Sequence, residues 1–94
     1  MMKGDMNMWY PFCKYFDVNM TQTPLDSNGY TVVKLERRRR GEKVKRMFIR
    51  VPGYEVFDIK EFTPEEVNKF SGIIVRLTDL VMLGARTPGG LNNA

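Results

Sequence analysis

Apolar and polar residues alternate along three stretches between residues 30 and 60. Residues 30–36, 44–51 and 56–60 follow a period of two, with apolar or β-branched side chains at every second position. This period is typical of a strand that buries one face and exposes the other. Glycine-containing turns separate the stretches and permit the chain to reverse. The pattern therefore predicts three antiparallel strands in a meander.

The residues before this meander are predicted to add an edge strand or an extended arm. Residues 9–18 are too aromatic for a linker, and Pro11 cannot donate to a strand ladder, which indicates an edge position. Residues 21–29 hold a dense cluster of turn formers and are predicted to be a loop. Most rings of the arm are expected to pack beneath the sheet, with a second stacking surface as the alternative. These rings belong to Trp9, Tyr10, Phe12, Tyr15 and Phe16.

One long amphipathic helix is predicted from Pro64 to Gly84. Thr63 is expected to be its N-cap, with Pro64 at the first helical position and Glu66 closing a capping box. Apolar residues then recur at spacings of three and four, which indicates a wide apolar face. Gly84 is expected to end the helix.

These elements predict one α+β domain over residues 9–84, flanked by flexible ends at 1–8 and 85–94. Its architecture is a curved antiparallel sheet of about four strands, followed by one C-terminal amphipathic α-helix. The helix carries more apolar groups than one sheet face requires, so we predict a helix-mediated homodimer. The expected interface residues are Phe70, Ile73, Ile74, Leu77, Leu80 and Val81.

Composition removes much of the usual enzyme chemistry. The chain has no His and one Cys, so it cannot form an internal disulfide, a Cys/His zinc site or a Cys-His catalytic pair. It has no glycine-rich phosphate loop, and Glu55, Asp58 and Glu61 show no metal-ligand spacing. We expect no catalytic activity, no cofactor and no metal. The sequence has neither a bilayer-spanning apolar run nor a secretory signal, which favours a cytoplasmic protein without a membrane partner.

Positive charge is concentrated between Arg37 and Arg50. Eight Lys or Arg accompany a single Glu42 there, a local charge of +7, whereas the whole chain carries +4. Alternation places Phe48 between Arg46 and Arg50 on the face away from the core. An exposed ring can stack on a base while neighbouring cations hold phosphates. The candidate nucleic-acid-binding residues are Tyr30, Lys34, Arg37, Arg38, Arg39, Arg40, Lys43, Lys45, Arg46, Phe48 and Arg50.

Other interpretations of the basic stretch stay open. The run is also typical of a solvated hairpin tip, a localisation-type patch or a contact with an anionic membrane. Alternation lets at most two of the four consecutive arginines, 37–40, face one side. Phe48 would be a core residue if a register slip reversed the two faces.

The order of these elements resembles the single-stranded-DNA-binding domain of the eukaryotic transcriptional coactivator positive cofactor four. The closest match is VFDIKEFTPEEVNKF, residues 56–70, which is similar to the last strand and the Asn/Thr-Pro-Glu helix start of that family. A looser match covers residues 30–83. The small size and the lack of a Ser-rich segment are similar to prokaryotic or bacteriophage-encoded members. The chain departs from the family in its aromatic residues 9–18 and its four consecutive arginines.

The resemblance implies a homodimer whose C-terminal helices pair and whose two sheets form channels for opposed single strands of DNA or for melted duplex. It implies stacking on Phe48 and, more weakly, Tyr30, with phosphate contacts from Lys34, Arg37, Lys45, Arg46 and Arg50. Such a protein would act in DNA replication, recombination or transcription, with replication or transcription proteins as further partners. The alternative function is a basic interaction protein that docks onto an acidic protein partner or RNA.

Overall fold

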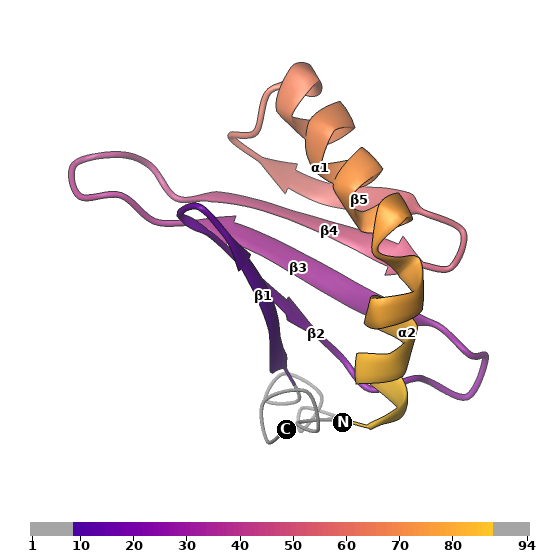
Figure 1. Ribbon diagram of the computed structural model, residues 1–94. Coiled ribbons are helices and arrows are strands. Elements are labelled where there is room, and N and C mark those ends of the chain that lie inside the picture. The colour runs from indigo at the N-terminus through magenta and orange to yellow at the C-terminus, as the bar shows by residue number, and fades with distance from the viewer. Residues whose placement is uncertain (1–8, 88–94) are drawn as a thin grey trace.

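The computed structural model describes residues 9–87, which form an α+β fold with a five-stranded antiparallel sheet and two helices (Figure 1). Strands are paired in sequence order, so each neighbours the next along the chain. The elements are β1 (Tyr10–Tyr15), β2 (Val18–Gln22), β3 (Thr31–Arg37), β4 (Lys45–Val51), β5 (Glu55–Lys60), α1 (Pro64–Arg76) and α2 (Thr78–Arg86). The predicted meander is therefore confirmed as the last three strands of a larger sheet.

The sheet has five strands because the aromatic arm folds back on itself as a hairpin. β1 pairs with β2 through a turn at Phe16 and Asp17, and Phe16 has a φ of 55°. Pro11 lies on an edge strand, as predicted. β2 extends to Gln22, so the first two residues of the predicted loop are in fact strand. Every second side chain from Val18 to Gln22 is buried, which is the pattern of a strand. The polar composition of residues 21–22 had indicated a loop, but the period of two decides the structure.

The predicted single helix is divided at Leu77 into α1 and α2. The Leu77 amide donates to two carbonyls, those of Ile73 (3.0 Å) and Ile74 (3.1 Å). The Thr78 hydroxyl donates to the Val75 carbonyl at 2.7 Å, a back-bond that tends to bend helices. The helix also continues to Arg86, beyond the expected end at residue 84.

The start of α1 agrees with the sequence in detail. The Thr63 hydroxyl accepts from the Glu66 amide at 3.1 Å, and the Glu66 carboxylate accepts from the Thr63 amide at 2.9 Å. Pro64 occupies the first turn. The capping box is therefore confirmed.

Both helices cover the same face of the sheet and enclose one apolar core (Figure 1). The strands supply Val18, Met20, Val33, Leu35, Met47, Ile49 and Val51. The helical side supplies Phe62, Phe70, Ile74 and Val81. Phe12 and Tyr15 also pack into this cluster, as expected of rings from the aromatic arm. Within residues 9–87, the opposite face of the sheet carries no helix.

The predicted dimer interface is wrong in part, because the larger sheet uses more of the helix surface. Phe70, Ile74 and Val81 are buried in the core of a single chain. Ile73 and Leu77 are partly buried against the same cluster. Within the predicted set, Leu80 is exposed. Two helix residues outside the set, Val75 and Leu83, are exposed as well.

The predicted ends of the domain are partly outside the described residues. Residues 1–8 and most of 85–94 belong to this undescribed part. Ala85 and Arg86, expected to be flexible, are the last turn of α2, and Ala85 is buried. Neither helix within residues 9–87 is long and apolar enough to cross a membrane.

Candidate nucleic-acid interface

The sheet face away from the helices is built from alternate residues of β3 and β4. Antiparallel pairing sets Lys34 opposite Phe48, Glu36 opposite Arg46 and Val32 opposite Arg50. The intervening residues of both strands are buried in the core. The prediction that Arg46, Phe48 and Arg50 share one face is therefore confirmed, and no register slip moves Phe48 into the core.

Phe57 of β5 extends this face, although it is not among the residues predicted from the sequence. Phe57 is the cross-strand partner of Phe48, and their rings stack with centroids 5.5 Å apart and planes 17° apart. A register shift then separates this pair from the next, Arg46 and Lys60, and Asp58 within the shift has a φ of 51°. The two-residue turn at 52–53 sets this register, because it places Phe57 opposite Phe48. Counting back from that turn in the sequence could have identified Phe57.

Trp9 also lies on this face, so among the rings of residues 9–18 it follows the alternative, a stacking surface, rather than packing beneath the sheet. Its ring centroid is 6.0 Å from that of Phe48, and the Lys34 ammonium lies 4.8 Å above its ring. Trp9 directly precedes the edge strand β1. The path of the chain into that strand, rather than the local sequence, decides on which face of the sheet the Trp9 side chain lies. Nothing in the alternation pattern of residues 9–18 could have placed it.

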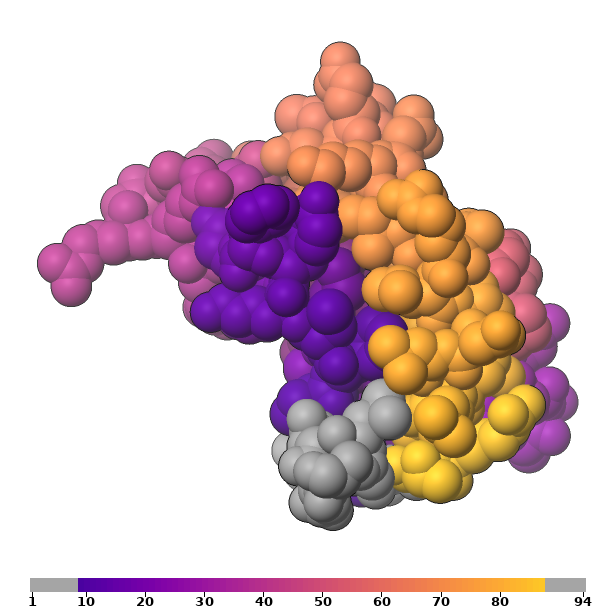
Figure 2. Space-filling view, in the orientation of Figure 1, coloured from indigo at the N-terminus to yellow at the C-terminus, as the bar shows by residue number. Residues whose placement is uncertain are grey.

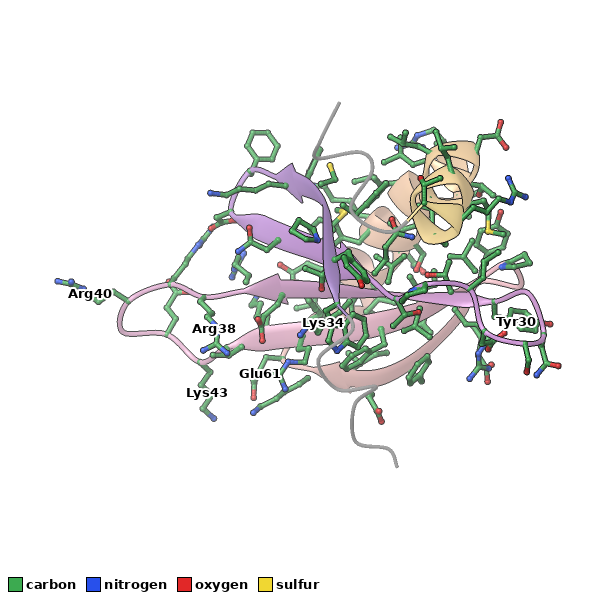
Figure 3. The ribbon with its side chains drawn as sticks, turned by 90° about the horizontal axis from the view of Figure 1, so that it is seen from below. Tyr30, Lys34, Arg38, Arg40, Lys43 and Glu61 are labelled. Carbon is green, nitrogen blue, oxygen red and sulfur yellow. The ribbon has the colours of Figure 1, made fainter. Side chains whose placement is uncertain are left out.

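Trp9, Phe48 and Phe57 line a hollow of about 530 Å³, which we call the aromatic groove. Its remaining lining residues are Thr23, Val32, Lys34 and Arg46. The groove thus combines three rings with two cations on an open sheet surface. Figure 3 shows Lys34 near the middle of this face, with the labelled hairpin residues Arg38, Arg40 and Lys43 to one side.

The basic loop between β3 and β4 projects from the body of the molecule (Figure 2).

Acidic residues pair with most of the cations between Arg37 and Arg50. Seven of the eight lie within 4.0 Å of a carboxylate of residues 9–87, and Arg40 is the exception. The six carboxylates involved belong to Asp17, Glu36, Glu42, Glu55, Glu61 and Glu66. Eight cations and six anions leave a local surplus of two charges, well below the +7 that this stretch has in the sequence.

Glu36 is the acidic residue at the centre of the open face. Its Oε2 atom accepts from Arg46 Nε at 3.0 Å and Nη2 at 2.8 Å, and from Arg38 Nη2 at 3.4 Å. Burial acts to raise the Glu36 pKa, but the Arg46 hydrogen bond and nearby positive charges outweigh it and lower the pKa. The carboxylate is therefore ionised at neutral pH.

Two candidate cations lie on the helix side of the sheet, away from Phe48. Lys45 Nζ bonds both carboxylate oxygens of Glu66, at 3.0 and 3.1 Å. Arg37 is the cross-strand partner of Lys45 and lines a small hollow with Phe70. Both side chains follow the alternation that buries Leu35 and Met47, so a strand bound on the Phe48 face would not reach them. The structure thus separates Arg37 and Lys45 from Phe48, and their phosphate contacts stay a prediction.

The remaining candidates lie beside the groove or beyond its end. The Arg50 guanidinium lies 5.5 Å from the Phe57 ring and 5.9 Å from the Tyr30 ring, and it also pairs with Glu55. Arg39 pairs with Asp17, which ties the basic loop to the β1–β2 turn. The loop cations 38–40 and 43 thus lie beyond the end of the groove, where they can act as an approach surface.

Comparison of the chain with protein-family models, with curated proteins and with solved structures found no match. The resemblance carried by residues 56–70 therefore stays a prediction. The function has to be inferred from the geometry of the open face.

Proposed function

We propose that this protein binds single-stranded DNA on the open face of its sheet and has no catalytic step. The observation that carries the proposal is the cluster of Trp9, Phe48 and Phe57, three rings gathered outside the core on the face without helices. Aromatic rings normally gain stability by burial in the core. A hollow lined by rings and cations is the arrangement with which single strands are held.

Base stacking favours single strands over duplex. Each base stacked on a protein ring contributes about 1–3 kcal/mol, and every base has a flat face that can stack. In duplex DNA these faces are already stacked on neighbouring bases. Binding of this kind is largely independent of sequence and suits melted duplex in replication, recombination or transcription.

Cations beside the groove would hold the phosphates. Lys34 lies over the Trp9 ring and has no carboxylate within 4.0 Å among the described residues. Arg46 and Arg50 are paired, but their side chains remain 34% and 40% exposed, so each guanidinium can turn from its carboxylate to a phosphate. We expect the electrostatic part of binding to be modest.

We also propose that the protein is a homodimer held by its helices. Val75, Leu80 and Leu83 are each more than two-fifths exposed on α1 and α2. Exposed apolar side chains on the helices of a small domain favour a contact with a second copy. The proposed interface replaces the buried members of the predicted set with residues that a partner can reach.

Removal of one groove ring should weaken binding to single strands. We expect Phe48→Ala and Phe57→Ala each to lower affinity for a fluorescent oligo(dT) about tenfold or more in anisotropy titrations. Phe16→Ala is the matched control, because it removes an equally large ring that is 77% exposed at the β1–β2 turn. Thermal unfolding of each variant would verify its fold. Equal losses in all three variants would contradict the aromatic groove as the binding site.

The same titrations separate this proposal from the alternative. A duplex of equal length should bind more weakly than single-stranded DNA. An RNA oligonucleotide of equal length should bind comparably or more weakly. A folded wild-type protein that binds none of the oligonucleotides, but retains an acidic protein after nuclease treatment, would instead support docking to an acidic partner through the basic loop.

A further inference from the structure

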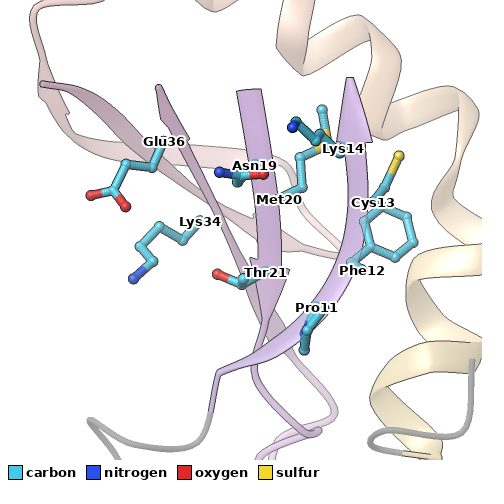
Figure 4. Close-up of a pocket in the computed structure, with 9 residues that line it drawn as sticks. All are labelled: Pro11, Phe12, Cys13, Lys14, Asn19, Met20, Thr21, Lys34 and Glu36. Atoms are coloured by element: carbon cyan, nitrogen blue, oxygen red, sulfur yellow. The ribbon is translucent and has the colours of Figure 1, made fainter. Parts of the chain in front are cut away.

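A second hollow of about 530 Å³ lies beside the aromatic groove and differs from it in chemistry. Its floor comes from β2 and β3, and it is bordered by the edge strand β1. Asn19, Thr21, Lys34 and Glu36 line it, and Figure 4 shows these four side chains directed to the same side of the sheet. Lys34 lines both hollows, so a strand stacked in the groove passes directly beside the second one.

Polar atoms in this hollow have unused hydrogen-bonding capacity. All hydrogen bonds to Glu36 from residues 9–87 go to Oε2, which leaves Oε1 as a free acceptor. The Thr21 hydroxyl is buried without a hydrogen-bond partner in the same part of the chain. Lys34, two residues from Glu36 on one strand face, supplies a donor. An anion and a cation are therefore adjacent, with neutral polar groups around them.

We propose that this hollow is a subsite for the edge of an unpaired base and that it favours guanine, an inference that rests on the single-strand binding proposed above. Guanine presents two adjacent N–H donors, N1–H and the N2 amine, next to one carbonyl acceptor, O6. The donors match the free Glu36 oxygen, and the carbonyl matches the Lys34 ammonium. Single-stranded bases are commonly recognised by hydrogen bonds on this edge.

Thymine fits the same groups worst. Its N3–H donor lies between two carbonyl oxygens, so any approach that brings N3–H to Glu36 also brings a carbonyl oxygen close to the carboxylate. Like partial charges then oppose the hydrogen bond in a partly buried site. Cytosine and adenine each carry one amine beside an acceptor and are intermediate. The expected order of affinity is guanine, then cytosine or adenine, then thymine.

The test uses fluorescent oligo(dT) in which one central residue is thymine, guanine or hypoxanthine, the guanine analogue without the N2 amine. We expect the guanine oligonucleotide to bind the wild-type protein about tenfold more tightly than oligo(dT), with hypoxanthine between them. A single guanine avoids the association of guanine-rich strands. Equal affinities for all three oligonucleotides would overturn the subsite and leave single-strand binding intact, whereas failure to bind any of them would overturn the proposed function itself.

Glu36→Gln should abolish the guanine preference, measured as the ratio of the affinities for the guanine oligonucleotide and for oligo(dT). An amide can present either its oxygen or its NH₂ group, so it serves guanine and thymine alike. The lost negative charge affects the guanine oligonucleotide and oligo(dT) alike, so the ratio of the two affinities is the readout. Glu55→Gln is the matched control, because it removes a paired carboxylate outside the hollow and should keep the preference. A guanine preference that survives in Glu36→Gln would also overturn the proposal.

Discussion

Gln22 is a polar side chain held in the apolar core, at 2% exposure. Its amide nitrogen donates to the Val81 carbonyl of α2 at 2.8 Å and lies 3.5 Å from the Thr31 hydroxyl. A buried amide is tolerated only when it is hydrogen-bonded, so this side chain joins the second helix to β2. It therefore helps to fix how the helices lie across the sheet.

Truncation of Gln22 should destabilise the fold. Gln22→Ala removes the hydrogen bond to α2 and leaves a cavity, so we expect a loss of about 2–4 kcal/mol in the free energy of unfolding. Asn19→Ala, an exposed change on the same strand, should stay within about 0.5 kcal/mol. Urea unfolding followed by circular dichroism measures both values. Similar losses for the two variants would contradict the role given to Gln22.

At the scale of single elements, the start of α1 concentrates several stabilising contacts. The Glu66 carboxylate closes the capping box and also pairs with Lys45 of β4, so one side chain joins the helix start to the sheet. The Thr63 amide, and to a lesser extent Lys45, hold the Glu66 pKa below its usual value of 4.5, against the effect of burial. The helix start is therefore sensitive to pH.

Acid should weaken this element through Glu66. Because the folded pKa is below the unfolded value, the stabilisation is complete above about pH 4.5 and is lost as the pH falls through the folded pKa. Glu66→Gln should therefore show a smaller loss of stability between pH 6 and pH 3 than the wild type, in urea unfolding at each pH. Glu65→Gln removes an exposed carboxylate from the same turn and should retain the wild-type dependence. An unaltered pH profile in Glu66→Gln would contradict this assignment.

For the whole molecule, the distribution of charge sets how strongly binding should depend on salt. The slope of log affinity against log salt is about −0.7 for each phosphate contact with a single strand. Eight cations bound to phosphates would give about −6, whereas contacts from Lys34, Arg46 and Arg50 predict about −2.

Anisotropy titrations with oligo(dT) across a salt series test this value. Lys34→Ala should reduce the magnitude of the slope by about 0.7. Lys69→Ala, which removes a cation packed against Tyr15 and Phe70 on the helix side, should not change it. A wild-type slope near −6 would mean that the cations of the basic loop also bind phosphates and would contradict the smaller electrostatic contribution.

Assembly is the second property of the whole molecule that can be tested. We expect sedimentation velocity at micromolar concentration to show a dimer, and Leu80→Asp to convert it to a folded monomer, because Leu80 is 42% exposed. Ile59→Asp is the control, since Ile59 is a comparably exposed apolar residue, at 49%, that belongs to β5 rather than to either helix. A wild-type monomer under these conditions would contradict the proposal.

The sequence by itself determined the features that depend on neighbouring residues. Alternation over residues 30–51 assigned Phe48 and its flanking arginines to one face, because a strand has a period of two. The spacing from Thr63 to Glu66 determined the start of α1, because a capping box closes within one turn. Both features follow from local backbone geometry and needed no knowledge of distant contacts.

Only the tertiary structure decided which distant residues meet on the open face. Trp9 and Phe57 join Phe48 through strand order and register, which depend on the whole sheet. The same pairing brings Glu36 beside Arg46 and Glu66 beside Lys45, so much of the charge that is prominent in the sequence is matched in the fold. Electrostatic and stacking energies depend on distance in space rather than along the chain, and the packed sheet is what sets those distances.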